Sequence, residues 1–156
     1  MKTSTFYLVS LLFMSVAFIT DSCDKKIKGC TDPDSTTYDE QAEKDDGSCR
    51  YEGYAVIWYG QEATKGLTAD GATALTFYIN GEVVGSSAAS VYWASEPGCG
   101  DDGTISITQD LGREKTRKFT LSVKDQDDFE YWKTDITLEG NACLALELTW
   151  SSRKKK

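Results

Sequence analysis

The stretch 75-LTFYINGEVVG-85 is the clearest fold signal in this chain. Leu75, Phe77 and Ile79 are apolar residues at alternate positions, as in a strand with one face in a core. They are followed by Asn80-Gly81, the strongest short signal for a β-hairpin, and by the start of a return strand. The stretch therefore predicts an antiparallel hairpin with one buried face.

The same alternation recurs outward from this hairpin, over residues 53–150. Further strands are expected at residues 54–59, 90–94, 105–107, 119–123, 132–138 and 144–150. No long helical pattern interrupts them. Because two half-apolar sheets must cover each other, we expect an all-β fold, namely an immunoglobulin-like antiparallel β-sandwich. A small barrel is the alternative.

The composition excludes several classes of function. The formal net charge of −8 disfavours nucleic acid, which requires a basic surface. Histidine is absent, which removes the commonest general base and metal ligand. Serine and threonine are abundant, but no Ser-x-x-Lys motif or other activator accompanies them. We therefore expect no enzymatic activity and no obligatory cofactor.

The N-terminus predicts export from the cytoplasm. An apolar run of 14 residues, 6–19, follows an early lysine. A membrane-spanning helix needs about 20 apolar residues, so this run is better suited to the core of a signal peptide spanning residues 1–22. Five cysteines in a chain of this length also favour an oxidising compartment.

The end of the apolar run, 19-ITDSC-23, resembles the loose lipobox of Bacteroidetes lipoproteins. The resemblance implies that Cys23 is lipidated and that residues 23–28 form a short tether to a membrane. Lipidation would leave four cysteines for two disulfides. The alternative is a secreted protein with a free Cys23. The expected location is the bacterial cell envelope, with the outer membrane favoured and the orientation of the anchor left open.

An acidic stretch bounded by Cys30 and Cys49 occupies residues 29–51. A disulfide between these cysteines would close about 20 residues and contribute roughly 3 kcal/mol in the chain-entropy description. A second disulfide, between Cys99 and Cys143, would close about 45 residues and contribute around 4 kcal/mol. This pairing keeps each bridge within its own region, and other pairings of the four cysteines stay open.

The ends of this stretch, Gly-Cys-Thr-Asp-Pro and Asp-Asp-Gly-Ser-Cys, resemble a short motif of secreted and surface proteins of flavobacteria. The later elements, including Pro-Gly-Cys-Gly around Cys99, resemble small flavobacterial lipoproteins of unassigned function. The acidic turns also have a weaker likeness to thrombospondin type 3 calcium repeats.

Two interpretations of the acidic stretch stay open. Calcium prefers carboxylate and carbonyl oxygens, and the candidate ligands are Asp32, Asp34, Asp45 and Asp46. Their spacing does not match an EF-hand. The alternative is a disulfide-closed acidic spacer that binds no metal.

Aromatic residues suggest a binding surface within the β-rich region. Outward rings could stack on a glycan or contact a peptide, with Trp58, Tyr78, Trp93 and Tyr131 as candidates. The alternative is packing in the core, since aromatics favour strands. The pairs Tyr92-Trp93 and Tyr131-Trp132 should each split into one buried and one outward ring.

Taken together, these patterns predict a membrane-anchored lipoprotein with a non-catalytic sandwich that binds or scaffolds a ligand outside the cytoplasm. A glycan- or peptide-binding module, or a calcium-stabilised adhesion-type module, is the alternative. The basic tail, residues 151–156, is expected to be frayed.

Overall fold

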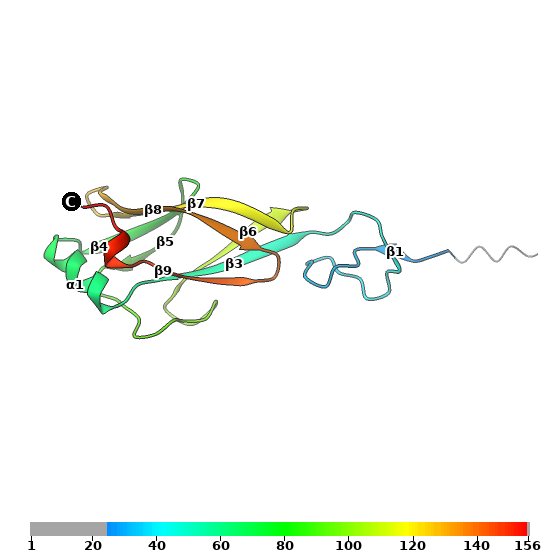
Figure 1. Ribbon diagram of the computed structural model, residues 1–156, viewed down its shortest axis with the longest axis horizontal. Helices are drawn as coiled ribbons and strands as arrows, with labels where there is room; N and C mark the ends of the chain where they lie inside the picture. The colour runs from blue at the N-terminus through cyan, green and yellow to red at the C-terminus, as the bar shows by residue number, and fades with distance from the viewer. Residues whose placement is uncertain (1–24, 156) are drawn as a thin grey trace, which may run out of the picture.

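The structure, a computed structural model, describes residues 25–155. Its larger part consists of two β-sheets, and a small cysteine-bounded module extends from one end (Figure 1). The predicted all-β sandwich is confirmed. The proposed signal peptide, residues 1–22, and the proposed lipidation site, Cys23, lie outside the described residues.

Each sheet combines strands from distant parts of the sequence. The three-stranded sheet contains, in spatial order, β6 (Ile105–Gly112), β3 (Tyr51–Trp58) and β9 (Cys143–Glu147). The four-stranded sheet contains, in spatial order, β5 (Glu82–Ala88), β4 (Ala74–Ile79), β7 (Thr116–Asp125) and β8 (Glu130–Glu139). Three strands against four is the composition of a seven-stranded immunoglobulin-like sandwich.

The predicted hairpin is present as β4 and β5. Leu75, Phe77 and Ile79 are buried in the core between the sheets. Asn80 and Gly81 have φ angles of 50° and 87°, which a tight two-residue hairpin turn requires. The alternation of apolar residues and the turn chemistry therefore act together to set the register of this hairpin.

One strand pairing differs from the sequence prediction of antiparallel strands throughout. β9 pairs with β3 in parallel, with Tyr54 opposite Cys143 and Trp58 opposite Glu147. β3 is the first strand of the sandwich and β9 the last, so the whole intervening chain serves as the crossover that parallel pairing needs. Alternation within a strand does not encode the direction of its neighbour, so the sequence pattern could not reveal this pair.

The predicted strand at residues 90–94 is absent. These residues belong to an irregular segment, residues 89–104, that lies along the outer side of the three-stranded sheet (Figure 1). The N–H of Trp93 donates to the carbonyl of Tyr59 at 3.1 Å. Further along, the disulfide between Cys99 and Cys143 attaches the segment to β9. The segment is therefore held against a sheet face without being part of the sheet.

β3 is buried on both of its faces as a result. Ala55 and Ile57 point into the core between the sheets. Val56 and Trp58 alternate with them, so they point to the outer side, yet they are only 0% and 9% exposed. The tethered segment lies on this outer side, where Val56 and Trp58 are buried, while Ser106 and Thr108 of the neighbouring β6 stay exposed.

A short helix that the sequence pattern does not predict, α1 (Gln61–Ala69), follows β3. Its buried residues Ala63 and Leu67 belong to the core. Gly66 lies against Trp150, the first residue of a 3-10 turn, η1 (Trp150–Ser152). Nine residues with two core contacts are too few to show a helical period in the sequence.

We expect Gly66→Ala to destabilise the protein, although alanine is the better helix former. A Cβ at this position would lie 2.1 Å from the Trp150 ring, so the packing must shift. Overpacking of this kind costs about 1–3 kcal/mol, measurable as a lower Tm by circular dichroism. Gly98→Ala is the matched control, because its new Cβ would meet its nearest atom at 3.5 Å. An unchanged Tm for Gly66→Ala would contradict this packing.

Candidate functional site

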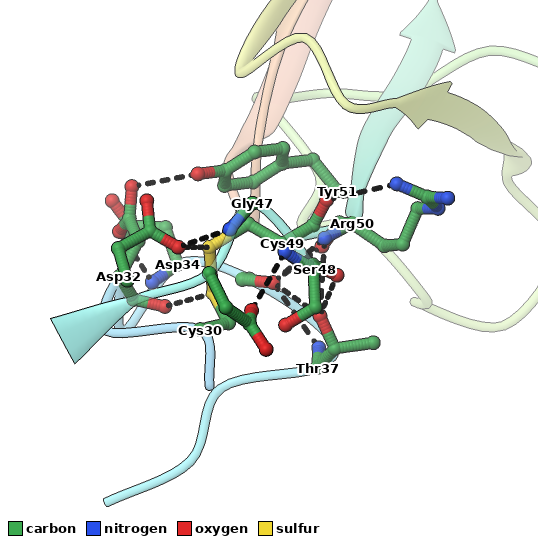
Figure 2. The surroundings of a disulfide bond; sticks show 12 residues. Cys30, Asp32, Asp34, Thr37, Gly47, Ser48, Cys49, Arg50 and Tyr51 are labelled. Carbon is green, nitrogen blue, oxygen red and sulfur yellow. Dashed lines mark hydrogen bonds between the residues drawn. A yellow bond between two sulfur atoms is a disulfide. The ribbon is translucent and has the colours of Figure 1, made fainter. Parts of the chain in front are cut away.

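The cysteine-bounded module is held by its predicted disulfide and by hydroxyl groups. Cys30 and Cys49 are bonded, with their Cα atoms 4.8 Å apart (Figure 2). The N–H of Arg50 donates to the hydroxyl oxygens of Ser35 and Thr37, at 3.0 and 3.1 Å. Two short strands, β1 (Lys28–Gly29) and β2 (Lys44–Asp45), pair in parallel at its start. Both predicted disulfides, including Cys99–Cys143, are therefore confirmed.

The four predicted calcium ligands fall into two pairs with different partners. Asp32 and Asp34 both bind the ammonium of Lys115, at 2.9 and 2.7 Å. Asp45 and Asp46 each accept a hydrogen bond from the backbone N–H two residues later, at 2.9 and 3.0 Å. Within residues 25–155, no three or more Asp, Glu, Cys or His side chains form a group that could hold a metal ion. The predicted calcium site is therefore not assembled.

Lys115 joins the module to the sandwich. It lies in the turn between β6 and β7, and the hydroxyl of Tyr51, at the start of β3, donates to Asp32 Oδ2 at 2.9 Å (Figure 2). The Lys115 ammonium lowers the pKa of Asp32, aided by the N–H of Asp34 and by the Tyr51 hydroxyl. Asp34 and Asp32 in turn raise the pKa of Lys115. A lysine of the same chain thus provides one positive charge that the two carboxylates share.

The four predicted ligand-binding rings do not share one surface. Trp58 and Tyr131 are buried, so the prediction that they meet a ligand is wrong. Tyr78 and Trp93 are partly exposed, but Tyr78 belongs to the four-stranded sheet whereas Trp93 lies in the segment over the three-stranded sheet. Of the four, only Tyr78 lines a hollow described below.

Tyr131 and Trp132 do not alternate between core and solvent as predicted. Both are buried, at 0% and 3% exposure. The pairing of β7 with β8 shifts register between Val123 and Lys124, next to these two residues. On the other side, the ring of Trp150 lies 6.3 Å from that of Tyr131. A local bulge and a covering C-terminal segment therefore bury a ring that simple alternation would expose.

The C-terminal tail is ordered where it meets β8, contrary to the prediction of a frayed end. The Arg153 guanidinium lies 3.4 Å from the centre of the Trp150 ring. The N–H of Lys154 donates to the carbonyl of Tyr131 at 2.7 Å, and its ammonium pairs with Glu130. The tail therefore packs onto the start of β8 instead of standing free in solvent.

A hollow of about 530 Å³ lies on the outer face of the four-stranded sheet. This volume is within the usual range for small-ligand sites. The hollow is lined by polar side chains and one aromatic ring, from Tyr78, Asn80, Gly81, Thr120, Ser122, Lys124, Glu130 and Lys133. This face has no counterpart to the disulfide-tethered segment on the opposite side of the sandwich, as far as the described residues go.

The register of three strands brings these side chains together. Ser122 of β7 lies opposite both Tyr78 of β4 and Lys133 of β8. Side chains directly opposite one another on one face are neighbours, about 5 Å apart at Cβ. Lys124 is two residues further along β7, and its ammonium lies 5.4 Å from the centre of the Tyr78 ring. A phenol ring, a hydroxyl and two ammonium groups therefore line one surface.

Glu130 forms a fixed acidic wall of the hollow. The Ser122 hydroxyl donates to Glu130 Oε1 at 2.7 Å, and the Lys154 ammonium pairs with the other oxygen. Lys154, and then Ser122, lower the pKa of Glu130, so its carboxylate is ionised at neutral pH. At the rim, Asn80 Oδ1 accepts the N–H of Thr120 at 2.9 Å. The groups that surround the two lysines are therefore preorganised.

Tyr78 is the one residue of the hollow that sequence reasoning named as a ligand-binding candidate. The outward positions of β7 and β8, including Ser122 and Lys133, were visible as the polar half of the alternation. What the pattern lacked was the order of the strands, which makes these positions neighbours. A polar outward face with two lysines and one aromatic residue, in an otherwise acidic chain, is the signal that could have found them.

Comparisons with protein-family models, with curated proteins and with solved structures each gave no match. Among the described residues, no helix is long and apolar enough to cross a membrane. The assignment of this site therefore depends on its own geometry.

We expect Lys115→Met to raise the pKa of Asp32 toward its ordinary value, because the principal cause of the lowered pKa is removed. Asp32 contributes stability that is present above its unfolded-state pKa and is lost as pH falls through its lower folded-state pKa. The variant should therefore lose part of the free energy of unfolding that Asp32 contributes at neutral pH, and its stability should depend less on pH in the acid range. An NMR titration of the Asp32 carboxyl measures the change. Lys118→Met, an exposed lysine on β7, is the control, and an equal shift in that variant would contradict the assignment.

Calcium should leave the stability of the chain unchanged. A ligand that binds the folded state raises Tm by mass action. Because the Lys115 ammonium already occupies the position between Asp32 and Asp34, we expect the same Tm in excess Ca²⁺ and in excess chelator, as measured by scanning calorimetry. A Tm several degrees higher with Ca²⁺ would revive the calcium interpretation.

Proposed function

We propose that this chain is a lipid-anchored protein of the bacterial cell envelope, and that its sandwich is a non-catalytic binding module. The observation that carries the binding role is the preorganised hollow on the outer face of the four-stranded sheet. The ligand would lie across β4, β7 and β8, with the Tyr78 ring and the Lys133 ammonium at opposite sides of Ser122.

The envelope location is supported by the N-terminal sequence and by the use of the cysteines. The N-terminus has the composition of a signal peptide, and Cys23 stands in a lipobox-like sequence. The two disulfides require an oxidising compartment such as the periplasm or the cell surface. Their presence uses four of the five cysteines, which leaves Cys23 for acylation.

A binding role suits the hollow better than catalysis. Its one carboxylate, Glu130, is held by Ser122 and Lys154 and lacks a second carboxylate among the lining residues. General acid–base hydrolysis of a glycoside uses two such groups. The lining instead offers a ring, hydroxyls, an amide and ammonium groups, which bind but do not activate a nucleophile.

Lipidation is tested by metabolic labelling. We expect the chain expressed in a Bacteroidetes host to incorporate an alkyne-tagged fatty acid and to fractionate with membranes. Cys23→Ser should lose both properties. Labelling that persists in Cys23→Ser, or a mature N-terminus that begins elsewhere than Cys23, would overturn the anchor.

The binding role is tested with the full chain in detergent, applied to a panel of oligosaccharides and peptides. We expect at least one class to bind and to protect β4, β7 and β8 from hydrogen exchange. Ser122→Trp should fill the hollow and abolish that binding. Thr108→Trp, at an exposed position of β6, is the matched control. Binding that survives Ser122→Trp would place the site elsewhere, and no binding from a folded chain would overturn the role.

A further inference from the structure

The hollow has a charge opposite to that of the chain. Its lining contains two lysines and one glutamate, whereas the chain as a whole has a net charge of −8. The Glu130 carboxylate is already paired with Lys154. The Lys133 side chain is exposed and forms no hydrogen bond or ion pair in the described part of the chain, although its charge adds to the lowering of the Glu130 pKa. The uncompensated charges that face a ligand are therefore ammonium groups, and these favour an anion.

The rest of the lining favours a hydroxyl-rich ring over a simple anion. The Tyr78 ring offers a flat surface on which the face of a sugar can stack. Asn80, Thr120 and Ser122 add an amide and two hydroxyls around it. The two hydroxyls already donate to the carboxylates of Glu130 and Asp135, so they offer a sugar hydroxyl their acceptor lone pairs, and the N–H₂ group of Asn80 can donate.

An extended acidic peptide fits this surface less well. Extended peptides bind β-proteins by adding a strand to a free sheet edge, where backbone groups are unpaired. The hollow lies instead over the outer face of β4, β7 and β8, and β4 and β7 are each paired on both sides. β8 is the edge strand, and its Tyr131 carbonyl next to Glu130 already accepts the N–H of Lys154. A ligand here can meet only side chains. This arrangement suits a saccharide, which has no backbone N–H groups to align.

We propose that the hollow binds an anionic saccharide, with Lys133 and Lys124 on its acidic group and the Tyr78 ring against a sugar face. This inference rests on the proposed binding role and names the class of its ligand. Lysine presents a point charge without the planar geometry that arginine offers to a carboxylate. Two lysines therefore select for negative charge and not for the shape of the acidic group, and the probes below carry carboxylates or sulfates.

The test is calorimetric titration of the full chain in non-ionic detergent with four probes. They are an oligogalacturonate, a heparin-derived tetrasaccharide, a neutral tetrasaccharide and a short polyglutamate peptide. We expect one or both acidic saccharides to bind at least about tenfold more tightly than the neutral saccharide and the peptide. Raising NaCl from about 50 mM to about 500 mM should weaken that binding severalfold.

Variants test the assignment of roles. Lys133→Gln and Lys124→Gln should each weaken binding of the acidic saccharide about threefold to tenfold. Lys118→Gln removes the same charge from β7 outside the hollow and should leave binding within about twofold. Tyr78→Ala should weaken binding of the saccharide about fivefold or more, with exposed Tyr92→Ala as its control.

Glu130→Gln tests whether positive charge in the hollow attracts the ligand. Removing this carboxylate from the wall of the hollow, and releasing the Lys154 ammonium, should strengthen binding of the acidic saccharide about twofold to fivefold. A variant that only disturbed the packing of the tail would weaken binding instead. Circular dichroism and Tm check that each variant is folded.

The outcomes separate this inference from the binding role beneath it. If the neutral saccharide binds as tightly as the acidic ones, and Ser122→Trp abolishes this binding, the proposal of an anionic ligand is overturned but the binding role is kept. Preferential binding of polyglutamate would overturn the saccharide. No binding of any probe by a folded chain would overturn the anionic saccharide, whereas the binding role would be overturned only by failure across the wider panel.

Discussion

The burial of β3 on both faces is the constraint on which the rest of the sandwich depends. A central strand that is apolar on both sides must be covered twice. Its inner side packs against the four-stranded sheet, and its outer side lies under the segment tethered by Cys99–Cys143. The outward side chain of Val56 is fully buried, at 0% exposure. The second disulfide therefore holds a segment on the outer side of β3 as well as cross-linking the chain.

This asymmetry explains why one face is free to bind. The strands of the four-stranded sheet alternate between apolar inward and polar outward residues, so that sheet needs no outer cover. Tyr78 and Ser122 can stay accessible there without a cost in buried polar groups. The covered strand and the proposed ligand-binding face thus belong to different sheets. Substitutions in the lining of the hollow should therefore leave the core intact.

The sequence allowed the elements to be predicted where local chemistry decides them. Asn80-Gly81 specifies a turn, and Phe77 and Leu121 follow the period of a half-buried strand. Both disulfides followed from the separation of the two regions. These features depend on near neighbours in the chain, or on a small number of cysteines.

Features set by distant residues could not be predicted in the same way. Tyr131 is buried because a bulge and Trp150 lie beside it. Asp32 looked like a metal ligand because its partner, Lys115, is 83 residues away. The hollow likewise exists only once β4, β7 and β8 are neighbours. In each case the residue types were visible, and the missing information was which of them meet.

The contact of Lys115 and Tyr51 with Asp32 has a mechanical consequence. A disulfide-closed module docked by an ion pair is a stiff joint, and a flexible linker at this point would let the sandwich tumble freely. Only four residues separate Cys23 from β1, a span of at most about 17 Å when fully extended. If Cys23 carries the anchor, the module and the sandwich move as one body at the end of this short tether. The reach of the hollow from the bilayer is then set by the length of that body and not by a flexible linker within it.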